Sequence, residues 1–148
     1  MKSLILSAAI IFTLTINAGA TNVEPFEKVL KTFNDTFKDV DNVSWTNSGD
    51  YYEAFFVDVT IKTRVMLDAK GNIVQTVRYY KEDKLPANVL SSIKKEYAGK
   101  EIAGVTEVTN KYGVNYRVVL KDNKSYTHIN VSNAGETETV SNYARGDK

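Results

Sequence analysis

The feature that most constrains the fold is an internal echo, in which residues of the same class recur at a constant offset of 64 positions. The same residue recurs at three of these positions, since Gly49 is matched by Gly113, Gly71 by Gly135 and Tyr52 by Tyr116. Apolar positions recur in class, as in the pairs Phe26 and Leu90, Val29 and Ile93, Phe33 and Tyr97, Val65 and Ile129, and Leu67 and Val131. Recurrence of class indicates that packing is the shared constraint, so the echo predicts one structural unit built twice.

Each unit reads as one helix followed by four strands. In the first unit, Pro25 precedes an apolar stripe at helical spacing, formed by Phe26, Val29, Leu30, Phe33 and Phe37. Strands are predicted over 43–46, 51–59, 61–67 and 73–80, separated by turns rich in Gly, Asn and Asp. Asp68 is interpreted as a turn former, with Gly71 at positive φ in the same hairpin.

The second unit repeats this order. Its helix stripe is built from Val89, Leu90, Ile93 and Tyr97, and its strands are predicted over 105–109, 115–120, 124–131 and 136–142. The connector 81–84 is too short to separate independent domains. The predicted fold class is therefore α+β, one domain made of two repeats, about 23–80 and 85–142. Each repeat is a helix plus a four-stranded antiparallel sheet, with the helices packed on one sheet face.

Residues 1–20 have the order of a secretory signal peptide, with Lys2 at the start, an apolar run over 4–16 and a small-residue cleavage pattern at 18–20. The alternative is a membrane anchor, but the apolar run is shorter than the roughly 20 residues that a span needs. Cleavage would leave residues 21–148, a normal size for one domain. We therefore predict a periplasmic or secreted protein with no membrane span after cleavage.

Composition excludes several classes of function. Loss of Lys2 with the signal peptide takes the formal net charge from +1 to zero, so no global field attracts nucleic acid. The chain contains no cysteine, which excludes a lipid-anchored lipoprotein, thiol catalysis and Cys-ligated metals. Stability must then come from core burial, with Trp45 expected to lie between helix and sheet.

The ordered series of motifs resembles a known family. The series runs from the signal peptide and amphipathic helix through residues 43–45, 52–56 and 68–71 to the Leu85-Pro86 start of the second helix. It resembles the small exported PepSY-like proteins, also called β-lactamase-inhibitor-protein-like, of Bacteroidetes-type bacteria, over nearly all of 23–140. The resemblance implies tandem helix-plus-sheet repeats, export and no catalytic activity. Inhibitors of this architecture generally use a concave sheet face.

The second half departs from the first at two positions. Ser132 occupies the position of Asp68, and Thr109 occupies the position of Trp45. No inhibitory contact can be carried over from the family, because no motif here marks one. The unshared residues are where function is expected first.

No residue pattern indicates a catalytic centre. His128 is the only histidine and shares a strand face with Tyr126 and Asn130, without an evident nucleophile to activate. The acidic residues lack the spacing of a calcium loop, and no pair is singled out as catalytic carboxylates. We predict no cofactor, no metal site and no enzyme activity.

Aromatic side chains give the clearest indication of a binding surface. The chain has nine tyrosines, and several lie at strand ends or in turns beside arginine. Tyr and Arg anchor protein interfaces, although amphipathic Tyr also covers half-buried sheets. The predicted partner-binding residues are Tyr51, Arg64, Arg78, Tyr79, Tyr80 and Tyr112.

These observations favour a non-enzymatic, monomeric binding module whose partner is a protein or peptide of the cell envelope, bound or inhibited by it. Two alternatives stay open at this point. One is a periplasmic accessory or sensor protein that binds a small molecule or metal ion, and the other is a hydrolase that uses scattered carboxylates.

Overall fold

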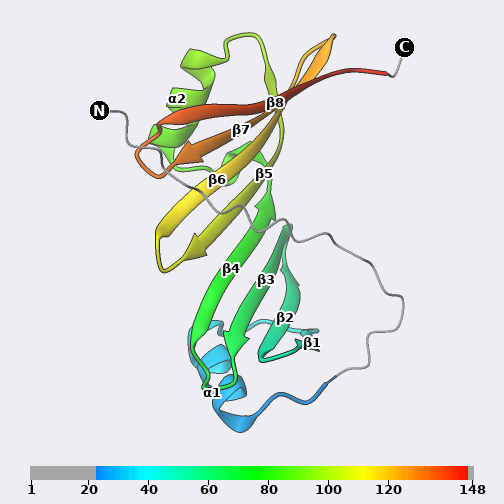
Figure 1. The fold of residues 1–148 in the computed structure, drawn as a ribbon, viewed down its shortest axis with the longest axis vertical. Helices are drawn as coiled ribbons and strands as arrows, with labels where there is room; N and C mark the ends of the chain where they lie inside the picture. Colours follow the sequence, from blue (N-terminus) through cyan, green and yellow to red (C-terminus); the bar gives the residue numbers. More distant parts are fainter. Residues whose placement is uncertain (1–22, 147–148) are drawn as a thin grey trace.

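The structure is a computed structural model, and it describes residues 23–146. Within this range the chain forms two α-helices, one short 3₁₀ helix and eight β-strands (Figure 1). In chain order these are α1 (Glu27–Thr36), β1 (Ser44–Ser48), β2 (Tyr51–Asp58), β3 (Ile61–Asp68), β4 (Ile73–Tyr80), η1 (Glu82–Lys84), α2 (Ala87–Glu96), β5 (Glu101–Asn110), β6 (Gly113–Lys121), β7 (Ser125–Ser132) and β8 (Thr137–Ala144). The fold is α+β, as the sequence predicts.

All eight strands belong to a single open antiparallel sheet, in which spatial order follows chain order from β1 to β8. The central pairing joins β4 to β5, from Gln75 opposite Asn110 to Tyr80 opposite Val105. This pairing makes the sheet continuous between the two halves. Figure 1 shows α1 and α2 near opposite ends of the elongated sheet.

Both helices pack against the same face of this sheet. Residues directly opposite each other on neighbouring strands point to the same face. One row of such partners crosses from β2 to β7 through Phe56, Thr63, Arg78, Glu107, Tyr116 and Val131. Phe56 belongs to the core under α1, and Val131 to the core under α2, so the row identifies one helix-bearing face. The opposite side is called the helix-free face below.

Two hydrophobic cores lie between the helices and this face. The α1 core is aromatic: the Phe33 ring lies 5.0 Å from that of Trp45 and 5.7 Å from that of Phe56, both edge to face. Such pairs add about 0.5–1.5 kcal/mol each beyond the area that they bury. The α2 core is aliphatic, with Ile93 packed among Val105, Val118, Leu120, Ile129 and Val131. Trp45 is buried, as predicted, with 9% of its surface exposed.

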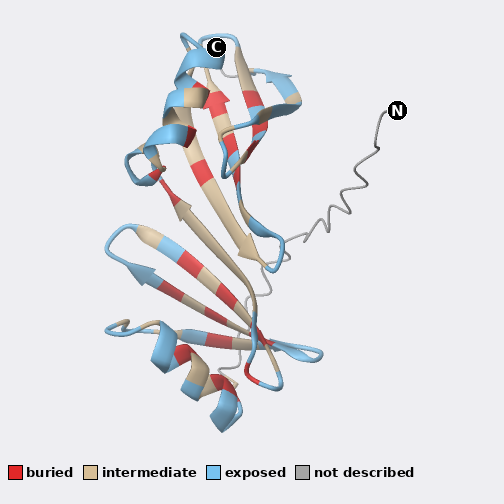
Figure 2. Cartoon of the chain, turned by 90° about the vertical axis from the view of Figure 1, so that its left-hand side faces the viewer, coloured by how far each residue is buried: buried red, intermediate tan, exposed pale blue. Residues whose placement is uncertain are grey.

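Between the two cores, β4 and β5 carry side chains that are only partly buried, as Figure 2 shows in tan. The last residue of β4, Tyr80, nevertheless belongs to the α2 core, and Ile61 of β3 packs against the same core. The first four strands therefore contribute to the burial of the second helix. The two halves are coupled through side chains as well as through the sheet.

The helix and strand predictions agree with the structure in type and order, with one notable difference in extent. β5 begins at Glu101 rather than at residue 105, because a shift of register between Ile102 and Gly104 allows three more residues to pair with β6. The predicted signal peptide, residues 1–20, lies outside the described residues. Within 23–146, no helix is both long and apolar enough to cross a bilayer.

The hairpins after β3 and β7 press against the helices at equivalent glycines. Gly71 and Gly135 have φ values of 88° and 89°, a region that disfavours side chains. A Cβ placed on Gly71 would lie 2.8 Å from the Lys28 carbonyl oxygen, and one on Gly135 would lie 2.5 Å from the Ser92 Oγ. The Asp68 carboxylate accepts hydrogen bonds from the Lys70 and Asn72 amides at 2.9 Å, which confirms it as a turn former.

We expect Gly71→Ala to destabilise the protein more than Gly135→Ala does. Both substitutions incur the cost of positive φ, about 1–3 kcal/mol. At Gly71 the new methyl group also meets a main-chain oxygen that cannot turn away, whereas the Ser92 hydroxyl can rotate. Denaturant unfolding would measure the difference. Gly49→Ala is the control, because Gly49 has φ of 61° and open space around it. Equal losses at all three positions would contradict the predicted role of the helix contact.

Candidate functional site

The helix-free face is the largest surface of the sheet that no element of the described chain covers. Its rows are found from the cross-strand pairing, as for the other face. One row runs through Phe55, Arg64, Val77, Val108 and Asn115, and the next through Val57, Lys62, Tyr79, Thr106, Arg117 and Asn130. Aliphatic, aromatic and cationic side chains therefore alternate across the middle of this face.

Three of the six predicted binding residues lie on the helix-free face. Tyr51, at the start of β2, is 43% exposed, and Tyr79 lies half-buried near the end of β4. Arg64 lies between them in the sheet order, on β3, and its Nε is 3.4 Å from the Glu53 carboxylate. The three residues share a face, but Tyr51 is opposite Asp68 at one end of β3, whereas Tyr79 is opposite Lys62 near the other end.

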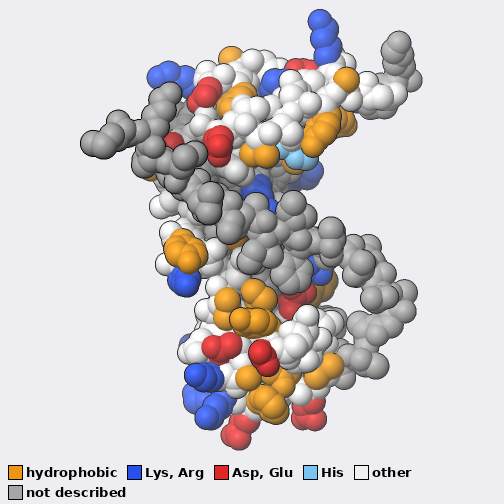
Figure 3. All heavy atoms as spheres, in the orientation of Figure 1, with side chains coloured by type: hydrophobic (Ala, Val, Ile, Leu, Met, Phe, Trp, Pro, Cys, Tyr) orange, Lys and Arg blue, Asp and Glu red, His pale blue; other side chains and the backbone are white. Residues whose placement is uncertain are grey.

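Tyr112 lies apart from this group. It occupies the turn between β5 and β6, where 81% of its surface is exposed. The Lys111 ammonium lies 4.9 Å from the centre of its ring, within the range of a cation–π contact. Figure 3 shows hydrophobic side chains in several groups on the visible side.

The structure corrects the placement of Arg78 and Tyr80, which lie on the helix-bearing face. Successive residues of a strand point to opposite sides, so Tyr79 and its two neighbours cannot share a surface. Tyr80 is 6% exposed, and its hydroxyl donates a 2.6 Å hydrogen bond to the Glu107 carboxylate. Arg78 pairs with the same carboxylate at 3.3 Å, and its guanidinium lies 5.6 Å from the Tyr80 ring centre. This cluster joins β4 to β5 and is structural.

The sequence prediction missed an aromatic group at the β7–β8 end of the helix-free face. Tyr126 and His128 share this face, and the Tyr143 ring packs edge to face on His128 at 5.5 Å. The Arg145 guanidinium lies 5.4 Å from the centre of the Tyr126 ring. The alternation of β7 in the sequence predicts that Tyr126 and His128 share a face. The sequence could not predict that Tyr143 lies beside them, because the pairing of β7 with β8 shifts register between His128 and Ile129.

The arrangement nearest to a catalytic dyad lies at the β6–β7 turn. Lys100 Nζ donates to Ser125 Oγ at 3.0 Å, the contact found between a general base and a nucleophile. The same ammonium also pairs closely with Asp122, whose pKa is lowered by hydrogen bonds from Lys100, Lys124 and Ser125. An ammonium held by a carboxylate has no lone pair with which to take the serine proton. The cluster therefore fastens the start of β5 to the turn.

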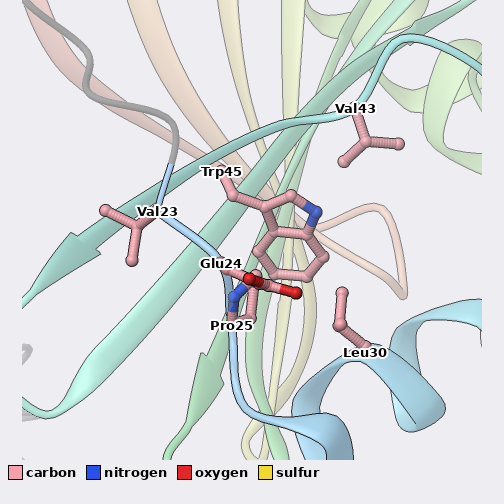
Figure 4. A pocket seen from close by; sticks show the side chains of 6 residues that line it. All are labelled: Val23, Glu24, Pro25, Leu30, Val43 and Trp45. Atoms are coloured by element: carbon pink, nitrogen blue, oxygen red, sulfur yellow. The ribbon is translucent and has the colours of Figure 1, made fainter.

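A shallow depression of about 300 Å³ lies beside α1, lined by Val23, Glu24, Pro25, Leu30, Val43 and Trp45 (Figure 4). The Trp45 ring lies at its centre, with Leu30 and Val43 turned toward it. The only polar side chain in the lining is Glu24. Across residues 23–146 there is no group of three or more His, Asp or Glu side chains arranged to hold a metal ion.

Comparison with solved structures identifies the fold. A BLIP-like protein from Bacteroides fragilis superposes with a TM-score of 0.64 at 18% identity, over 84% of this chain and 91% of the other. A protein described as a putative periplasmic protein from Bacteroides eggerthii gives 0.62 at 17% identity, over 82% and 90%. A DUF2874 family protein from Bacteroides ovatus gives 0.63 at 20% identity, over 79% and 89%.

These matches confirm, at the level of the fold, the predicted resemblance to the BLIP-like proteins of Bacteroidetes-type bacteria. No family model matches the sequence. No curated protein matches it either. Because the identities are only 17–20%, we interpret the residues of the helix-free face from this structure alone.

We expect Tyr80 to stay protonated until the protein unfolds in alkali. Burial raises its pKa, and the hydrogen bond to Glu107 raises it further. A group whose pKa is higher in the folded state stabilises the fold fully below its unfolded pKa, about 10, and loses that contribution as pH rises through the native pKa. Stability should therefore fall above pH of about 10, as measured by circular dichroism alongside tyrosinate absorbance.

Tyr80→Phe is the matched control for this titration. The difference between wild-type and variant absorbance should contain one tyrosinate that appears together with unfolding. A difference signal that appears near pH of about 10, while the circular dichroism is still native, would contradict the buried hydrogen bond.

Proposed function

We propose that this chain is a non-enzymatic, exported module that binds a protein or peptide of the cell envelope through its helix-free face. The observation that carries the proposal is the composition of that face. Tyr79 lies at its centre, with cationic side chains and aliphatic side chains around it, on the face of the sheet that no described helix covers. Aromatic and arginine side chains are the types that dominate binding energy in protein interfaces.

Two further observations support the proposal. The fold neighbours include a BLIP-like protein, and the fold is therefore one in which protein recognition is a reasonable expectation. A second neighbour is described as a putative periplasmic protein, which agrees with the signal-peptide pattern of residues 1–20. Similarity of fold alone does not establish a function, so the proposal rests on the residues of the helix-free face.

The proposal includes the organisation of the chain. We infer that residues 21–148 form the mature protein, a single monomeric domain of two repeats, about 23–80 and 85–142. The order of one helix and four strands in each half supports the repeat, and so do the equivalent contacts of Gly71 and Gly135 with their helices.

Site-specific photo-crosslinking in the native host tests the function. A benzophenone side chain at position 79 or 115 stands on the helix-free face, where Tyr79 is half-buried and Asn115 is exposed. We expect these two positions to yield the same discrete crosslinked species, identified by mass spectrometry of the envelope fraction.

The matched controls are positions 31 and 95, which are exposed on α1 and α2. They should yield no such species. Equal crosslinking from the helices, or no species from either face position, would refute a binding role for the helix-free face. Tyr80 is unsuitable as a probe or as an alanine variant, because its removal empties part of the α2 core.

A further inference from the structure

We propose that the helix-free face selects an acidic segment of its protein partner, held by Lys62 and Arg117 on the two sides of Tyr79. The inference rests on the proposed function and adds the chemistry of the partner. Three observations support it. The two cations lie in one row with Tyr79, neither has an ion-pair partner in the described chain, and apolar side chains lie beside them.

Lys62, Tyr79 and Arg117 lie in one row across the sheet. Lys62 is opposite Tyr79, Tyr79 is opposite Thr106, and Thr106 is opposite Arg117. Neighbouring strands are about 4.8 Å apart, so three steps separate the two cationic residues by about 14 Å at the main chain. The Tyr79 ring stands between them on the same face.

The charges on this face are compensated unevenly. Two of its acidic residues are already engaged, since Glu53 pairs with Arg64 at 3.4 Å and Glu101 pairs with Lys121 at 3.2 Å. Lys62 and Arg117 are both exposed, and neither forms an ion pair with any residue in 23–146. The row therefore presents two positive charges without ion-pair partners, and its β8 end carries one exposed acidic residue, Glu138, opposite Asn130.

Apolar side chains surround these two charges. Val57, next to Lys62, is 50% exposed, and the adjacent row contributes the half-buried Val77 and Val108. A partner that covers these side chains also removes water from around the two cations. Carboxylates placed there would interact more strongly than at an open surface, whereas an apolar partner would leave two cations buried without partners.

The geometry favours an extended segment that crosses the strands. In an extended chain, residues four apart lie on the same side and are about 13 Å apart, close to the spacing between Lys62 and Arg117. Two carboxylates with this spacing can meet both cations, and the residue midway between them would lie between Tyr79 and Thr106. The occupant is thus a segment with acidic residues at positions i and i+4 and an apolar or aromatic residue at i+2.

Nuclear magnetic resonance titration of the purified mature protein tests this assignment at low ionic strength. The probe is a ten-residue peptide of serine and threonine with glutamate at its third and seventh positions and valine between them. We expect amide shifts on β3 to β6 around Tyr79. We also expect affinity about tenfold lower for the same peptide with glutamine at both positions, since two exposed ion pairs, each individually weak, are then lost.

Lys62→Gln/Arg117→Gln should lower the affinity for the glutamate peptide by a similar factor. Lys28→Gln/Lys95→Gln is the matched control, because it removes the same charge from exposed positions on the two helices and should leave the affinity unchanged. Equal affinities for the two double variants, or no binding of the glutamate peptide to the wild type, would overturn the proposal. Vesicles of phosphatidylglycerol that bind through Lys62 and Arg117 where the peptide does not would assign the row to lipid instead.

The crosslinking experiment separates this inference from the proposed function. If a partner is captured at position 79 equally by wild type and by Lys62→Gln/Arg117→Gln, the helix-free face binds a protein but not through acidic residues. In that case the proposed function stands and the acidic partner is refuted. If capture is lost only in this double variant, both are supported.

Discussion

The main-chain pairing of β4 with β5 is the constraint on which the rest of the structure depends. It turns two groups of four strands into one sheet, and it fixes which side chains share a face from β1 to β8. Because side chains alternate along each strand, a slip of one residue at this pairing would turn the whole second half over and expose its core. The Arg78–Glu107 contact and the Tyr80 hydrogen bond lie across this pairing and oppose such a slip.

These polar contacts are located where neither helix covers the sheet fully. Glu107 is the most deeply placed of the charged groups in the structure's ion pairs, with 14% of its side chain exposed. A carboxylate at that depth needs donors, and it has two from β4. Hydrogen bonds therefore specify the β4–β5 pairing together with apolar burial. Loss of either donor would leave the half-buried Glu107 carboxylate with only one hydrogen-bond donor from β4.

The sequence could predict the parts of the fold that repeat a simple period. The stripe that contains Phe33 has a helical period, and the Asp68 and Gly71 hairpin has a turn signature, so both were predictable. β4 was more difficult, because Val77 and Tyr79 on one face and Thr76 and Tyr80 on the other give both faces a mixed character. Only its pairing with β3 and β5 decides which of the two adjacent tyrosines is buried.

The candidate site could be predicted only in part for the same reason. Tyr51, Arg64 and Tyr79 are found on one face, whereas Lys62 and Arg117 had no signal in the sequence. These two residues are more than fifty positions apart, and they become neighbours in one row only through three strand pairings. A local pattern cannot encode that relation. The fold neighbours do not supply it either. Proteins that share a fold need residues of the same class in the core, but the residues of their open faces can differ.

Tyr80 and Ile61 join the second core from the first half, and this has a consequence for how the protein assembles itself during synthesis. The first helix and its strands emerge complete, yet the cover for these two apolar side chains is α2 and the strands after it. A chain halted before α2 would hold an exposed apolar end next to the unpaired main-chain groups of β4. The second half therefore covers apolar surface of the first, and synthesis of α2 and the strands after it is what completes that cover.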